Sequence, residues 1–210
     1  MLDCVDLGCG VGGSIGWAKS RFGGETFLGI DNRKSELERA REKGYNVVFA
    51  DITDVSCEIP KCRFITMLHF LEHLKNEAQV KNVLEKSVKA ATEFIFIKVP
   101  CFDKIKYLAS LGFKLTWTDW IGHPTNVTTE MLKKITEELK FEAKIGSLYK
   151  INDSSSNEIV PICSPVDTIV YSEKLGAKEL IQFKDVYRET YCLINVNCQN
   201  FQELSRYEYQ

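Results

Sequence analysis

The 210-residue sequence predicts an α/β fold, with a doubly wound, mostly parallel sheet of seven strands and helices on both of its faces. Two observations lead to this prediction. First, strand-like apolar runs alternate with helix-like runs over about the first 100 residues, and this alternation is typical of a parallel sheet. Second, a glycine-rich turn joins the first apolar run to the first helix-like run, and in such units the turn lets the backbone approach a ligand closely.

The first half of the chain is divided by residues that end strands or begin helices. We expect strands at 2–7, 26–30, 46–50, 63–68 and 93–99, and helices at 14–22, 35–44 and 75–91. The second helix begins with Ser35 and carries Glu38 three positions later, which is the pattern of a capping box, and Gly44 ends it. One face of the third helix is apolar, with Val80, Val83, Leu84, Val88 and Ala91.

The second half is less regular. We expect a short helix at 103–111, an aromatic segment at 116–124, a helix from a Thr128 cap to about Leu139, and a sixth strand at 141–151. A seventh strand at 187–196 is predicted to run antiparallel at or near the edge of the sheet. These elements indicate a single domain over 1–210, with a core at about 1–100 and 128–210. Segments 101–127 and 152–186 are candidate lid or substrate-binding segments.

Composition narrows the class of protein. The formal net charge is −2 and the pI is about 6.0, so no basic field favours nucleic acid as a partner. No apolar run reaches the ~18 residues that a membrane helix needs, and no signal-peptide pattern opens the chain, so we expect no membrane partner. Eight cysteines are scattered without a Cys-x-x-Cys pair, which favours a reduced, cytoplasmic protein over a disulfide scaffold. Oligomer formation stays open.

Three aspartates end or closely follow the first three predicted strands: Asp6, Asp31 and Asp51. Because the carboxyl ends of parallel strands meet at one edge of a sheet, we expect all three near the same ligand. The spacing from Gly13 to Asp31 suits a carboxylate that accepts hydrogen bonds from both hydroxyls of a ribose. Aspartate is also common at strand ends and helix caps, but three of them beside a glycine-rich turn favour a ligand site.

The glycine-rich turn leaves two cofactors to consider. Gly8, Gly10 and Gly13 satisfy G-x-G-x-x-G, the dinucleotide fingerprint. Asp6, two residues before the first glycine, argues against a dinucleotide because a fixed carboxylate would repel a pyrophosphate and attract a cation. S-adenosylmethionine carries an ammonium and a sulfonium and needs no phosphate cradle. We therefore expect S-adenosylmethionine and S-adenosylhomocysteine to bind, and NAD not to bind.

These motifs resemble those of class I S-adenosylmethionine-dependent methyltransferases over residues 2–100, and residues 123–126 resemble a segment of the methyltransferase-11-like subgroup. The resemblance implies a Rossmann-like sheet and S-adenosyl-L-methionine as cofactor. It also implies cofactor contacts, which are Gly8, Cys9 and Gly10 along the methionine part, Asp6 near its amino group, Asp31 at the ribose, Asn32, Asp51 and Ile52 around the adenine, and Leu68 with His69 where the methyl group points.

Two features depart from the pattern of this family. Arg63 begins the fourth predicted strand, where the family usually has an acidic residue, and the first strand begins almost at Met1, without the helices that usually cover the cofactor. We therefore expect the cover to come from segments 101–127 and 152–186 or from a partner chain, or the chain to be part of a longer product.

The pattern His69-x-x-Glu72-His73 is open to a second interpretation. H-x-x-E-H is typical of zinc peptidases, in which both histidines bind the metal from one helix and the glutamate acts as base. Here the five residues directly follow an apolar strand, and the same letters resemble the turn after the fourth strand of many small-molecule methyltransferases. We therefore expect no metal, and keep a zinc-dependent hydrolase as an alternative.

Methyl transfer to oxygen or nitrogen needs a group that receives a proton, and His69 and His123 are the candidates because imidazole titrates near neutrality. Both should approach one cleft, with segment 117–123 folded back as a lid. Aromatic residues available to wall the cleft are Phe102, Tyr107, Trp117 and Trp120. The predicted activity is methyl transfer to a small or medium-sized acceptor. A nicotinamide-dependent oxidoreductase and a cofactor-binding module without activity also stay open.

Overall fold

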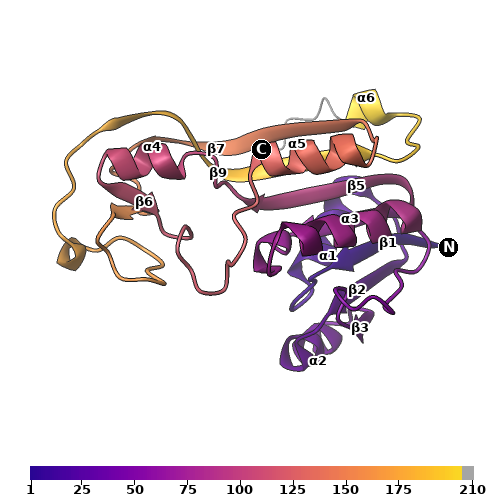
Figure 1. Ribbon diagram of the computed structural model, residues 1–210. Coiled ribbons are helices and arrows are strands. Elements are labelled where there is room, and N and C mark those ends of the chain that lie inside the picture. Colours follow the sequence, from indigo (N-terminus) through magenta and orange to yellow (C-terminus); the bar gives the residue numbers. More distant parts are fainter. Residues whose placement is uncertain (205–210) are drawn as a thin grey trace.

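The computed structural model describes residues 1–204, and seven strands form one sheet in the order β3-β2-β1-β4-β5-β9-β7 (Figure 1). The strands β1 to β5 are parallel, and β9 is antiparallel to both of its neighbours. The bounds are β1 (Leu2–Leu7), β2 (Phe27–Asp31), β3 (Val47–Phe49), β4 (Cys62–Leu68), β5 (Ala91–Pro100), β7 (Ala143–Asp153) and β9 (Gln182–Asn195). Strand order reverses between β1 and β4, and ligands bind at such a switch point.

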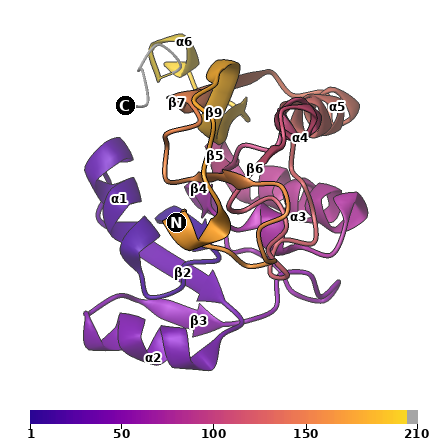
Figure 2. The ribbon, with the colours of Figure 1, turned by 90° about the vertical axis from the view of Figure 1, so that its left-hand side faces the viewer.

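Helices cover both faces of this sheet (Figure 2). They are α1 (Gly13–Phe22), α2 (Lys34–Glu42), α3 (Glu77–Ala90), α4 (Ile105–Ser110), α5 (Thr129–Glu138) and α6 (Phe201–Leu204), with short 3-10 turns η1 (Leu71–His73) and η2 (Glu173–Leu175). The apolar faces of α3 and α5 share one core cluster with the strands, whereas α1 packs on an aromatic cluster on the other face. The predicted doubly wound α/β fold is therefore confirmed.

Two details of the sequence prediction needed correction. The capping-box prediction at Ser35 is wrong, because α2 begins at Lys34 with Arg33 as its N-cap and no side chain caps it. The Asp31 carboxylate at the end of β2 instead accepts a hydrogen bond of 2.9 Å from the backbone N–H of Arg33, the N-cap residue of the helix. The predicted antiparallel strand does lie near the edge of the sheet, with only β7 outside it, but it begins at Gln182, earlier than expected.

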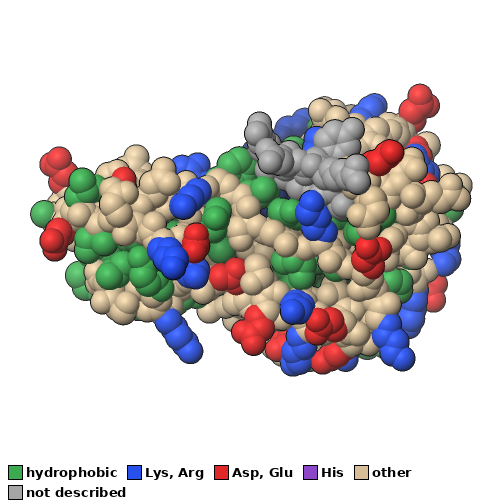
Figure 3. Space-filling view, turned by 90° about the horizontal axis from the view of Figure 1, so that it is seen from above, with side chains coloured by type: hydrophobic (Ala, Val, Ile, Leu, Met, Phe, Trp, Pro, Cys, Tyr) green, Lys and Arg blue, Asp and Glu red, His purple; other side chains and the backbone are tan. Residues whose placement is uncertain are grey.

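Segments 101–127 and 152–186 pack together as one unit that protrudes beyond the carboxyl end of β5, on the left of Figure 1. Two short strands, β6 (Phe113–Leu115) and β8 (Ile159–Pro161), pair antiparallel there. The sequence analysis missed both strands. Exposed apolar side chains on this unit are Ile121, Ile162, Val166, Ile169, Val170 and Leu180. In Figure 3, hydrophobic side chains gather on the protruding end, whereas charges of both signs are mixed over the rest of that face.

The helices and the cysteines bear on the expectations about membrane spans and disulfides. Among the helices of residues 1–204, none combines the length and the apolar character needed to cross a membrane. All eight cysteines lie in this part of the chain as free thiols. Burial raises the pKa of Cys9 and Cys192 to about 12, so these thiols act as small apolar side chains.

Candidate functional site

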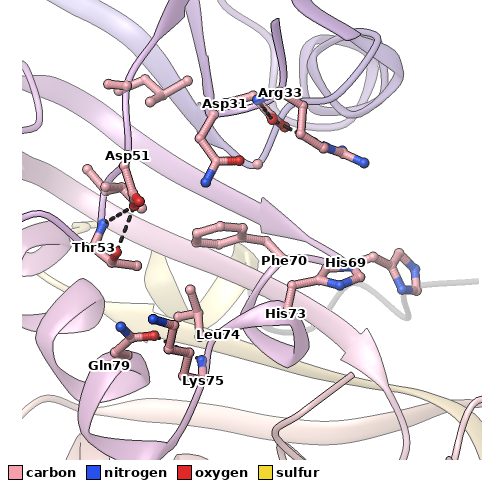
Figure 4. A pocket seen from close by; sticks show the side chains of 15 residues that line it. Asp31, Arg33, Asp51, Thr53, His69, Phe70, His73, Leu74, Lys75 and Gln79 are labelled. Carbon is pink, nitrogen blue, oxygen red and sulfur yellow. Dashed lines mark hydrogen bonds and ion pairs between the residues drawn. The ribbon is translucent and has the colours of Figure 1, made fainter. Parts of the chain in front are cut away.

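A cavity of about 330 Å³ opens at the carboxyl edge of β1, β2, β3 and β4 (Figure 4). Its walls come from the glycine turn, from the loops that follow β2 and β3, and from the turn that follows β4. Among the predicted site residues, those that line it are Gly8, Asp31, Asn32, Asp51, Ile52 and His69. The volume is in the usual range for small-molecule and cofactor sites. Two of the three predicted strand-end aspartates, Asp31 and Asp51, therefore line one cavity, together with Gly8 of the glycine turn.

The glycine turn meets this cavity at Gly8. Gly8 has a φ of 73°, and a Cβ atom built there would lie 2.5 Å from Cδ2 of Phe70. The ring of Phe70, which also lines the cavity, therefore rests directly on the backbone of the turn. Only glycine allows both this backbone conformation and this approach.

Replacing Gly8 by alanine is expected to weaken cofactor binding and to lower thermal stability. The left-handed backbone disfavours an L residue by roughly 1–2 kcal/mol, and the new methyl group would also push Phe70 into the cavity. Gly44→Ala is the matched control, since Gly44 has a φ of 83° but open space around the built Cβ. Calorimetric titration should show a loss of S-adenosylmethionine affinity for Gly8→Ala alone. Equal affinity in both variants would contradict this reading of the turn.

Asp6 lies behind the turn and does not line the cavity. Its carboxylate is buried and accepts hydrogen bonds from Oγ of Ser14 and Oγ1 of Thr66, each at 2.5 Å. Loss of solvent raises the pKa of Asp6 to about 6, against the effect of these two hydrogen bonds. Cys9 is also buried, against Gly29 of β2. Asp6 and Cys9 therefore support the turn from below.

Asp31 is held in place by backbone groups on both sides. The N–H of Gly10 donates to Oδ2 and the N–H of Arg33 donates to Oδ1, both at 2.9 Å. The Arg33 guanidinium covers the remaining side, with Nε 3.3 Å from Oδ1, although its side chain is 62% exposed. The carboxylate is thus fixed at the cavity wall, and a ligand hydroxyl can take the place of the exposed guanidinium.

Asp51 lines the cavity just beyond the end of β3, the strand next to β2 (Figure 4). Its Oδ1 accepts hydrogen bonds from the backbone N–H of Thr53 at 2.9 Å and from the Thr53 hydroxyl at 2.7 Å. These bonds, together with one from the Asn32 side chain, hold the pKa of Asp51 below its usual value. Ile52 adds a buried apolar surface beside it. A carboxylate can accept a hydrogen bond from an amino group on an aromatic ring, and an apolar side chain beside it can pack against that ring.

Leu68 and His69 point in different directions. Leu68 packs on the aromatic cluster between the sheet and α1, away from the cavity, because successive residues of a strand face opposite sides. His69 follows β4 with a φ of 52°, which is uncommon for a residue other than glycine. This conformation turns its ring to the cavity wall.

A second cavity of about 460 Å³ adjoins the first and shares His69 and His73 with it. Its other lining residues are Glu72, Pro100, Trp117, Trp120, His123, Tyr149, Glu158, Arg188 and Glu189. The structure thus brings His69 and His123 to one cavity, although they are far apart in the sequence. Trp117 and Trp120 line it as expected, but Phe102 is buried and Tyr107 packs within the protruding unit.

The two predicted bases differ in protonation. Burial alone would lower the pKa of His69, but the hydrogen bond with Glu189 (2.9 Å) and the charge of Glu72 outweigh it and raise the pKa to about 9. His69 is therefore a cation at neutral pH. Burial lowers the pKa of His123, so this ring is neutral there. Because Nδ1 of His123 donates to the carbonyl of Trp117 at 3.2 Å, its Nε2 keeps a free lone pair.

The H-x-x-E-H sequence does not form the helix of a zinc peptidase. Only Glu72 and His73 belong to the single turn η1, and His69 lies before it in a left-handed conformation. Sequence reasoning missed Glu189 and Arg188, which reach this site from β9. No local signal marks them, since the pairing of β9 with β5 brings them there.

The comparisons with known proteins agree with this geometry. Residues 4–91 match a family model described as a methyltransferase domain. No curated protein sequence matches the chain. Among solved structures, a SAM-dependent methyltransferase from Archaeoglobus fulgidus aligns with a TM-score of 0.62 and 20% identity, covering 92% of this chain and 86% of that one.

Two other solved structures are similar. Magnesium protoporphyrin IX methyltransferase from Synechocystis PCC 6803 with bound SAM has a TM-score of 0.54 and 13% identity, covering 92% of this chain and 70% of that one. A structure from Haloferax volcanii, a complex of a methyltransferase with the Trm112 methyltransferase activator, has a TM-score of 0.61 and 11% identity. The alignment covers 92% of this chain and 82% of that one.

The strand order places the first cavity at the switch point of a fold that the chain shares with these solved structures. Residues 4–91 match a methyltransferase domain, and the described residues share their fold with solved S-adenosylmethionine-dependent methyltransferases.

Proposed function

We propose that the protein transfers a methyl group from cofactor bound in the first cavity to a small or medium-sized acceptor bound in the second. The observation that carries the proposal is that the two cavities share His69 and His73 as a common wall. When bound, S-adenosylmethionine supplies an electrophilic methyl group on a sulfonium, and the protein has to bring the acceptor into line with it.

The residues present fit this cofactor. Gly8 gives the backbone approach, Asp31 offers fixed carboxylate oxygens for the ribose, and Asn32, Asp51 and Ile52 surround the remaining end of the cavity. In this proposal, Asp6, Cys9, Gly10 and Leu68 act from behind the wall and do not touch the cofactor. The backbone N–H of Gly10, for example, holds the Asp31 carboxylate in place.

The second cavity favours an acceptor with an oxygen or nitrogen nucleophile. Its walls combine two indole rings with three histidines, Arg188 and three glutamates. These groups can pack against an apolar body and bind a polar end. The mixed surface charge argues for a small molecule over nucleic acid as acceptor. We also propose that residues 1–210 act as one domain, with segments 101–127 and 152–186 covering the acceptor.

The eight free thiols support a reducing, cytoplasmic location.

We expect S-adenosylmethionine and S-adenosylhomocysteine to raise the melting temperature, whereas NAD leaves it unchanged. A ligand at 100 times its dissociation constant stabilises a protein by about 2.7 kcal/mol, which a thermal melt resolves. Stabilisation by NAD without an effect of either sulfur compound would overturn the proposal. A screen of acceptors for S-adenosylhomocysteine release then separates an enzyme from a binding module without activity.

A further inference from the structure

Three metal-binding side chains meet in the wall of the second cavity. Ligand atoms of Glu72, His73 and His123 lie within 4.8 Å of one another. Glu72 and His73 belong to η1, whereas His123 comes from the aromatic segment. The N–H of Thr125 donates to the carbonyl of Glu72 at 3.3 Å and ties the two segments together. The cluster is therefore built by a tertiary contact and not by one helix.

The buried Glu72 carboxylate has a charged neighbour in His69 but accepts no hydrogen bond from the described part of the chain. Its side chain is 0% exposed, and within residues 1–204 neither oxygen has a hydrogen-bond partner. Nδ1 of His69 lies 3.6 Å from Oε1, close enough for electrostatic attraction but too far for a hydrogen bond. Buried carboxylates are normally hydrogen-bonded, paired or bound to a metal. A cation in the cluster would supply the missing partner.

Each of the two histidines uses one ring nitrogen on a backbone carbonyl, which leaves the other nitrogen for a metal. A carbonyl oxygen only accepts, so Nδ1 of His73 donates to Gly122 at 2.7 Å and Nδ1 of His123 donates to Trp117 at 3.2 Å. In the neutral rings, Nε2 is then the nitrogen with a free lone pair. Metal-bound histidines characteristically donate their other ring nitrogen to a carbonyl or carboxylate in this way.

We propose that Glu72, His73 and His123 bind a divalent transition-metal cation, with open coordination positions toward the second cavity. Two imidazoles and one carboxylate suit cations such as Zn²⁺ or Co²⁺ and leave positions for water or substrate. The exposure of His73 provides access from that side. This site departs from the sequence-based expectation of no metal, and it excludes His69, the first residue of H-x-x-E-H, as a ligand.

The binding of the cation depends only on the three side chains. Its role beside the acceptor rests on the proposed function, which it makes more specific. An acceptor with a hydroxyl or carboxylate oxygen would coordinate the cation and lie next to the wall shared with the cofactor cavity. The lone pair of His123 would then bind metal, and His123 would not act as a proton acceptor.

The test is titration of the chelator-treated full chain with Co²⁺, followed by calorimetry and visible absorption. We expect one equivalent to bind and to raise the melting temperature. Glu72→Gln and His73→Asn should each lower the affinity at least about tenfold, the lower limit for losing even an outer partner of a metal site. Glu158→Gln is the matched control, because Glu158 lines the same cavity but pairs with Arg188 at 2.8 Å, and it should bind Co²⁺ like the wild type.

Without metal, Glu72→Gln should be at least as stable as the wild type, since it removes a buried charge whose two oxygens accept no hydrogen bond from the described residues. A purely structural glutamate would instead lose stability on this change. Should Glu72→Gln not fold, His73→Asn carries the test, because His73 is exposed. Absence of stoichiometric Co²⁺ binding, or binding retained in the folded variants, would overturn the proposal. Titration of S-adenosylmethionine on the same samples keeps the two questions separate: Co²⁺ binding without cofactor binding would leave the metal site standing and remove the proposed function.

Discussion

Replacing Asp31 by asparagine should weaken S-adenosylmethionine binding by about 10- to 100-fold, because a hydrogen bond to a charged group contributes roughly 1.5–3 kcal/mol. Asparagine has the same shape and keeps one acceptor oxygen for a backbone N–H, but its NH2 group faces the other N–H, so the variant loses the charge and one of the two backbone hydrogen bonds. The effect follows from the position of Asp31 at the cavity wall, where the backbone of Gly10 and Arg33 fixes both carboxylate oxygens.

Asp54→Asn is the control for the Asp31 variant. Asp54 also accepts bonds from the residue two positions later, Ser56, but it does not line the cavity. Isothermal titration with S-adenosylmethionine should therefore give the wild-type dissociation constant for Asp54→Asn. An affinity within twofold of the wild type for Asp31→Asn would show that the cofactor ribose is not bound at this carboxylate.

The lining of the first cavity was predictable where its residues follow directly from strand ends. An apolar run fixes where β2 or β3 stops, and the topology of a parallel sheet then places Asp31 and Asp51 at the same edge. What the sequence could not give was the direction of each side chain. Leu68 and His69 are neighbours, yet the left-handed backbone of His69 puts only one of them in the cavity.

The lining of the second cavity was predictable only in part. The aromatic segment and His123 could be assigned to it because they follow the last parallel strand. Glu189 and Arg188 could not, since they arrive through the pairing of β9 with β5, about 90 residues apart in the chain. Strands β6 and β8 were missed for a similar reason. Each has only three residues, too few to show the alternation of apolar and polar residues that marks a strand, and the two strands pair although they are far apart in the sequence.

The letters H-x-x-E-H show how a motif depends on its backbone. On a continuous helix, His69 and His73 would share a face and could bind one metal. Here the strand ends at Leu68 and only one 3-10 turn follows. As a result, His69 pairs with Glu189 at 2.9 Å, and the histidine that joins Glu72 and His73 is His123, from 50 residues further along.

Replacing His123 by asparagine should lower turnover by at least about 100-fold, the range in which positioned proton-transfer groups act, and a lost metal ligand should be no less harmful. Cofactor affinity should change little, because His123 lines the second cavity and not the first. The measurements are S-adenosylhomocysteine formation with an acceptor from the screen and titration of S-adenosylmethionine into the same variant.

Tyr171→Phe is the control for the His123 variant, because it also removes one hydrogen bond to a carbonyl in the protruding unit. Tyr171 donates to the carbonyl of Gly176 at 2.9 Å and lines neither of the two cavities. Its turnover should stay close to that of the wild type, which separates loss of a catalytic or metal-binding group from loosening of the unit. If His123→Asn weakened cofactor binding and kept its turnover per bound cofactor, His123 would belong to the cofactor site and the second cavity would not hold the acceptor.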